Sequence, residues 1–139
     1  MVDAYVLSNL QERLSLSDDQ FVRLLPLVKR LQAERREAMD RRARAVREMR
    51  RLLKSGTATE PEVLAQLKEW KANEADDPLR GRKGMDAIDA LLSPLQQAKF
   101  RVFEAEVSQK LRELTGQMRR QNRVESRPEP GKPRRPDQP

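Results

Sequence analysis

The chain has 139 residues, of which 37% are charged and 37% hydrophobic, so it suits one domain without a wide globular core. It has no Cys and no His, which excludes disulfides and removes two side chains common in nucleophilic and acid–base catalysis. The formal net charge is +7, and Lys and Arg are concentrated between residues 29 and 54. This basic segment predicts attraction to anionic surfaces.

The first half of the sequence predicts two helices. Most residues are strong helix formers and no run of alternating β-branched residues predicts a strand, so the sequence favours an all-α fold. Residues 3–14 have the spacing of a short amphipathic helix. A long helix is expected from Ser17 to about Lys54, with a kink or a delayed regular start at Pro26. Residues 55–58 form the turn that follows, with Gly56 just past the helix end.

A second long helix is expected to begin at Thr59, whose side chain would form a capping box with Glu62. Its apolar positions then recur every three or four residues and include Trp70. The segment 76–84 contains Asp-Asp-Pro and two glycines and predicts a kink or a short loop. Helical spacing then resumes up to Leu92.

The last helix is expected from Ser93 to about Arg120. Its apolar face consists of Phe100, Phe103, Val107, Leu111, Leu114 and Met118. The sequence then becomes rich in proline, which predicts a disordered, basic tail over residues 122–139. Residues 1–121 are left as the helical domain.

Two pentapeptides share the pattern Leu-Ser-x-x-Gln. They are Leu16-Ser17-Asp18-Asp19-Gln20 and Leu92-Ser93-Pro94-Leu95-Gln96. Each Ser is expected to cap a helix, and each Gln is expected to reach back from the third helical position to the N–H of the capping residue. Both motifs are therefore predicted to be structural helix starts.

The paired motifs and the order of the helices resemble the Spy/CpxP family of small periplasmic helical proteins, whose motif has Thr where this chain has Ser. The resemblance covers roughly residues 4–121. It implies a long kinked helical hairpin with a short N-terminal helix and a C-terminal helix, paired into an elongated, antiparallel, cradle-like homodimer. It also implies an ATP-independent periplasmic chaperone that binds unfolded client proteins. The sequence shows no signal peptide, which leaves two interpretations: a cytosolic protein, or one whose leader was removed upstream. The resemblance favours removal and a periplasmic location.

The long basic helix carries the candidate client-binding residues. One of its faces alternates cations with flexible apolar groups, and a further arginine lies nearby: Arg35, Met39, Arg42, Val46, Met49 and Arg47. One interpretation is a dimer seam flanked by arginines whose alkyl stems cover apolar surface. The other is an exposed surface that attracts acidic, unfolded chains and adapts to them. Both can apply along one helix.

Other functions are less well supported by the sequence. The segment Gly81-Arg82-Lys83-Gly84 lacks the spacing of a phosphate-binding loop, so no catalytic residue is expected. Without His, and with too few oxygens at Asp76-Asp77, no metal or other cofactor is expected. The basic run at residues 41–47 has no zipper heptads after it and no interleaved aromatics, which argues against nucleic acid. No segment approaches the about 20 apolar residues of a membrane span. The main alternative is an envelope-stress or metal-resistance regulator that binds a protein such as a sensor kinase or an anti-sigma factor.

Overall fold

The computed structural model describes residues 2–126, and this part of the chain is helical without strands. The helices are α1 (Val2–Leu14), α2 (Asp18–Ser55), α3 (Glu60–Asp89) and α4 (Pro94–Glu125). The helices α1 to α3 and the beginning of α4, up to Arg101, form one compact unit, and the rest of α4, from Val102, belongs to a second. The predicted all-α fold is confirmed for the described residues, whereas the proline-rich segment 127–139 lies outside them.

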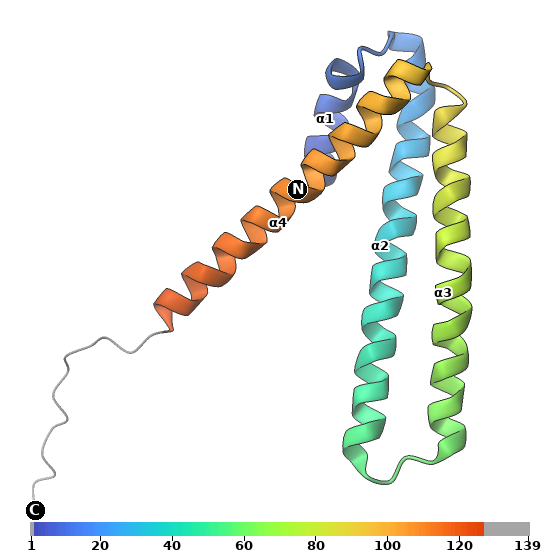
Figure 1. Cartoon of the computed structure of the whole chain (residues 1–139), viewed down its shortest axis with the longest axis vertical. Coiled ribbons are helices and arrows are strands. Elements are labelled where there is room, and N and C mark those ends of the chain that lie inside the picture. The colour runs from blue at the N-terminus through green and yellow to red at the C-terminus, as the bar shows by residue number, and fades with distance from the viewer. Residues whose placement is uncertain (1, 127–139) are drawn as a thin grey trace, which may run out of the picture. The chain divides into compact units, whose positions relative to one another are not determined.

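The helices α2 and α3 form an antiparallel hairpin (Figure 1). Gly56 caps α2 with a φ of 69°, a left-handed conformation that glycine adopts without steric cost, as predicted for the turn. Thr59 precedes α3, but its side chain makes no capping hydrogen bond. The predicted box with Glu62 is therefore wrong. The Thr59 hydroxyl does not accept the N–H of Glu62 that a capping box requires, and Pro61 between them has no N–H to offer instead.

The helix α3 continues unbroken through residues 76–84, so the short loop considered for this segment is absent. Contacts with α2 hold the segment in place. Asp77 accepts a hydrogen bond from Arg41 of α2, with 2.8 Å between Oδ1 and Nη2. A Cβ atom at Gly84 would lie 3.0 Å from Cδ1 of Leu31, so the glycine lets the two helices approach. Tertiary packing here outweighs the poor helix propensity of proline and glycine.

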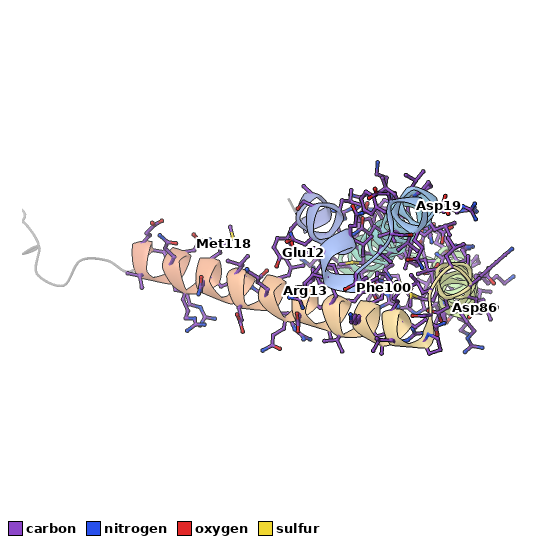
Figure 2. The ribbon with its side chains drawn as sticks, turned by 90° about the horizontal axis from the view of Figure 1, so that it is seen from above. Glu12, Arg13, Asp19, Asp86, Phe100 and Met118 are labelled. Atoms are coloured by element: carbon purple, nitrogen blue, oxygen red, sulfur yellow. The ribbon has the colours of Figure 1, made fainter. Side chains whose placement is uncertain are left out.

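The core of the first unit lies where α1, the beginning of α2, the end of α3 and the beginning of α4 meet. Its largest fully buried side chains are Leu10, Leu14, Leu24, Val28, Leu31, Ile88 and Phe100. A view along the hairpin shows Phe100 toward the interior and Asp19 and Asp86 on the outside (Figure 2). Burial of each such apolar side chain contributes about 1.5–3 kcal/mol, so this end holds the helices together.

The helix α4 ends at Glu125 rather than near Arg120, so residues 122–125 are helical and do not belong to the tail. Its predicted apolar face divides into two parts. Phe100 and Phe103 are buried. Leu111, Leu114 and Met118, which we call the α4 stripe, are 45%, 50% and 66% exposed, and Met118 projects from the ribbon in Figure 2. The stripe belongs to the second unit.

Candidate functional site: the paired motifs and the hairpin faces

Both predicted capping boxes are present. The N–H of Gln20 donates to the Ser17 hydroxyl at 3.1 Å, and the N–H of Ser17 donates to Oε1 of Gln20 at 3.2 Å. The corresponding distances between Gln96 and Ser93 are 3.2 and 3.0 Å. The leucine that opens each motif is buried, at 7% exposure in both cases. Each motif thus starts a helix and fixes it to the core.

The two motifs also bind each other through their glutamines. Nε2 of Gln20 donates to Oε1 of Gln96 at 3.0 Å, and Nε2 of Gln96 donates to Oε1 of Gln20 at 3.1 Å. Each amide makes a second donation, from Gln20 to the carbonyl of Leu91 and from Gln96 to that of Ser15. Both carbonyls lie five residues before the glutamine of their own motif. The network therefore has an approximate two-fold symmetry in which both donors and both acceptor sites of each amide are used.

The two halves of this network rest on different turns. Ser15 has a φ of 52°, and its N–H and that of Leu16 donate to the carbonyls of Glu12 and Gln11. This is the Schellman ending of a helix, with serine where glycine is usual. After α3 the cap residue Ala90 is right-handed instead. The two carbonyls that accept from the Gln20–Gln96 pair thus belong to turns with different backbone conformations.

An ion pair stabilises the connection between α3 and α4. Arg101 of α4 donates twice to the carboxylate of Asp89 at the end of α3, at 3.0 and 2.7 Å. These hydrogen bonds lower the pKa of Asp89, and its partial burial opposes them only in part. The pair therefore joins the end of α3 to the second turn of α4.

One side of the hairpin combines an aromatic ring, arginine and exposed apolar groups. The Arg42 guanidinium lies over the Trp70 ring, 5.7 Å from its centroid, within cation–π range. Along α2, residues that follow or precede Arg42 by three, four, seven or eleven positions share its side. We call this surface the amphiphilic face; it consists of Arg35, Met39, Arg42, Val46, Met49 and Leu53 of α2 with Leu67 and Trp70 of α3. Met39 and Leu53 are 72% and 75% exposed, whereas Val46 and Met49 are half-buried.

The other side of α2 carries a second row of arginines. Here an open groove of about 450 Å³ lies between the helices. We call it the arginine groove; it is lined by Arg41, Arg44, Ala45, Arg47, Glu48, Arg51, Gln66 and Glu69. Arg47 follows Arg42 by five residues, about 140° around a helix. The structure therefore separates Arg47 from the other five candidate client-binding residues, which lie together on the amphiphilic face.

Charges in the arginine groove are only partly paired. Arg51 donates to Glu48 in the preceding turn of α2, and this hydrogen bond lowers the pKa of the Glu48 carboxyl. Among the described residues, Arg44 and Arg47 have no acidic partner within ion-pair distance. Arg41 extends across the contact between α2 and α3 to Asp77. Arg80 also contacts Asp77, at 3.2 Å. Arg41 lines the arginine groove, and its partner Asp77 lines a small pocket beside Trp70. The ion pair therefore connects the two.

The sequence did not reveal the contact between Arg42 and Trp70, although a signal for it was present. Residues equally distant from the turn face each other in an antiparallel helical hairpin. Arg42 and Trp70 each lie 14 residues from Gly56 (56 − 42 and 70 − 56). This spacing places the two residues in the same region of the hairpin but does not fix their pairing, because Leu31 and Gly84, which also pack together, lie at unequal distances from Gly56.

Among the described side chains, no group of three or more acidic residues is placed to hold a metal ion. No described helix is both long and apolar enough to cross a bilayer. Comparisons with known proteins find no match to a family model, to a curated protein or to a solved structure.

Proposed function

We propose that this chain is an ATP-independent chaperone of the Spy/CpxP type, acting in the periplasm, and that it holds unfolded or aggregation-prone proteins on the amphiphilic face. The observation that carries the proposal is the exposure of Met39 and Leu53 on the same side of α2 as Arg42, whose guanidinium lies over Trp70. Large apolar side chains gathered on a surface of a soluble helical domain typically mark an interaction site. The paired motifs supply the resemblance from which the chaperone class and the location follow.

The face combines two kinds of attraction. Arg35 and Arg42 act at a distance on acidic segments of a client, and salt screens this attraction within about 8–10 Å. Met39, Met49 and Leu53 act at contact, and each contributes about 1–2 kcal/mol when a client buries it. Many weak contacts of this kind allow release without nucleotide.

An aggregation assay without ATP tests this function. A reduced or heat-unfolded protein serves as the client, at two salt concentrations. We expect Met39→Ser/Leu53→Ser to weaken suppression of aggregation by speeding release, and Arg35→Glu/Arg42→Glu to slow association and reduce its salt dependence. Val22→Ser/Leu79→Ser is the matched apolar control, because both residues are exposed away from the amphiphilic face. Equal effects of the control would contradict the proposal.

We further propose an antiparallel, cradle-like homodimer in which the α4 stripe contributes to the contact between subunits. Leu111, Leu114 and Met118 lie at spacings of three and four and leave an apolar strip exposed in a single chain. A second copy offers the same strip. Sedimentation at tens of micromolar should give a dimer that Leu114→Glu dissociates; a monomeric wild-type chain would contradict it.

The α4 stripe also supports the second candidate, a stress or metal-resistance regulator that docks on one sensor kinase or anti-sigma partner. A random DNA duplex serves as a further control in the aggregation experiments. If the chain does not bind unfolded clients but binds the duplex tightly, the result would favour a nucleic-acid-binding function. A chain that binds neither would favour the regulator.

A further inference from the structure

We propose that the arginine groove binds an anion that carries two or more neighbouring phosphate groups. A soluble oligophosphate and a lipid headgroup with two phosphates share this chemistry. The groove lies on a different side of α2 from the amphiphilic face, so the proposal does not depend on chaperone activity. It assigns a second binding surface to the same basic helix.

The spacing of the arginines suits a linear anion. Arg41, Arg44, Arg47 and Arg51 follow one side of α2 and span about 15 Å along its axis at 1.5 Å per residue. Guanidinium groups present a planar fork of donors that matches phosphate oxygens in pairs. Gln66 of α3 adds an amide on the opposite wall. Arg44 and Arg47 can therefore engage neighbouring phosphate groups, and Arg51 can join them when it is released from Glu48.

The charge balance of the groove also favours phosphate. Four arginines line it against the two carboxylates of Glu48 and Glu69, and of the four, Arg41 is paired with Asp77 and Arg51 with Glu48. Arg44 and Arg47 lack an acidic partner among the described residues, so their charges are available to a ligand. Both kinds of anion are repelled by the two glutamates. Adjacent phosphate groups, however, carry several negative charges within a short distance, so the excess of arginines attracts them more strongly than a single carboxylate. The groove contains no aromatic ring on which a nucleic acid base could stack.

Titration calorimetry with sodium tripolyphosphate at constant ionic strength tests the proposal. We expect one site per chain. Arg44→Gln/Arg47→Gln should weaken binding at least about tenfold. The matched control, Arg35→Gln/Arg50→Gln, removes the same charge from other sides of α2 and should change affinity at most about twofold. Thermal melting verifies that all variants are folded.

Variants that strengthen binding make the test independent of any damage to the fold. Glu48→Gln releases Arg51 and removes a repulsive charge, so it should tighten tripolyphosphate binding about threefold or more. Glu12→Gln on α1 changes the net charge equally and serves as its control. Equal effects of Glu48→Gln and Glu12→Gln would mean that only the overall charge matters, which would overturn the proposed site.

A vesicle-binding experiment distinguishes a soluble oligophosphate from a lipid headgroup as the ligand. Vesicles of phosphatidylcholine are compared with vesicles that also contain cardiolipin, whose headgroup has two phosphates. Loss of binding in Arg44→Gln/Arg47→Gln supports the site with either ligand, and the ligand that binds identifies the source. Absence of binding to both, or an equal loss in Arg35→Gln/Arg50→Gln, overturns it.

Discussion

Gln20 and Gln96 hold each other through two reciprocal amide hydrogen bonds, although 76 residues separate them in the chain. Each glutamine also closes the capping box of its own helix. The start of α2 and the start of α4 are therefore fixed by one shared network. The repeated motif is thus explained as two halves of a single junction.

The junction should show strong coupling in a double-mutant cycle. Gln20→Ala or Gln96→Ala removes a capping bond and leaves the partner amide and a carbonyl without their hydrogen bonds. We expect each to lower the free energy of unfolding by about 2 kcal/mol, and the double variant to lose about 1 kcal/mol less than the sum. Denaturant unfolding measures all three, and strict additivity would mean that the amides do not act as a pair.

The serine caps should contribute separately. Ser17→Ala and Ser93→Ala should each cost about 1 kcal/mol, because each leaves an N–H in the first helical turn without its acceptor. Thr59→Ala is the matched control, since Thr59 makes no capping hydrogen bond and should cost less than about 0.5 kcal/mol. A loss at Thr59 as large as that at the serines would contradict the assignment.

The two glycines of α3 should respond in opposite ways to alanine. Gly81→Ala adds a methyl group where no atom lies within 4 Å and should stabilise the helix by about 0.5–1 kcal/mol. Gly84→Ala has the same gain in propensity, but its Cβ would lie 3.0 Å from the buried Leu31. We expect it to be at least about 1 kcal/mol less stable than Gly81→Ala. Equal melting temperatures would show that the helices do not pack closely at Gly84.

The sequence is sufficient for the helices and for the caps at Ser17, Ser93 and Gly56, because these depend on neighbouring residues, whereas the box predicted at Thr59 is absent. The capping boxes at Ser17 and Ser93 and the left-handed Gly56 follow from side chains within one turn of the helix. The loop considered within 76–84 was wrong because propensity says nothing of the contacts that α2 makes with Asp77 and Gly84.

The site was less accessible from sequence than the fold. A helical pattern placed Arg35, Met39 and Arg42 on one face correctly, since periodicity determines which residues share a side. Nothing in the spacing shows that Gln20 meets Gln96, because their contact depends on how four helix ends converge. Its charge groups Arg47 with the client-binding residues, but its position about 140° around α2 from Arg42 places it on another side, where it lines the arginine groove.

The ion pair between Asp89 and Arg101 should make stability depend on pH. The pKa of Asp89 is lowered in the folded chain, so its contribution is fully present above the unfolded pKa of about 3.9. It is lost as the pH falls through the lower folded pKa. Asp89→Asn should therefore cost about 1 kcal/mol at pH 7 and less near pH 2. Unfolding curves that differ equally at both pH values would exclude a role for the charge.

The most direct test of client binding is to find which side of the hairpin a client touches. A photo-crosslinking amino acid is placed at Met39 or Leu53 on the amphiphilic face, or at Arg44 in the arginine groove, and each variant is irradiated with a heat-unfolded client. If clients bind the amphiphilic face, we expect strong crosslinks to the unfolded client from positions 39 and 53 and weak ones from position 44. Crosslinks to the folded client should be weak from all three positions. Equal crosslinking from the two sides, or none from positions 39 and 53, would contradict binding on this face.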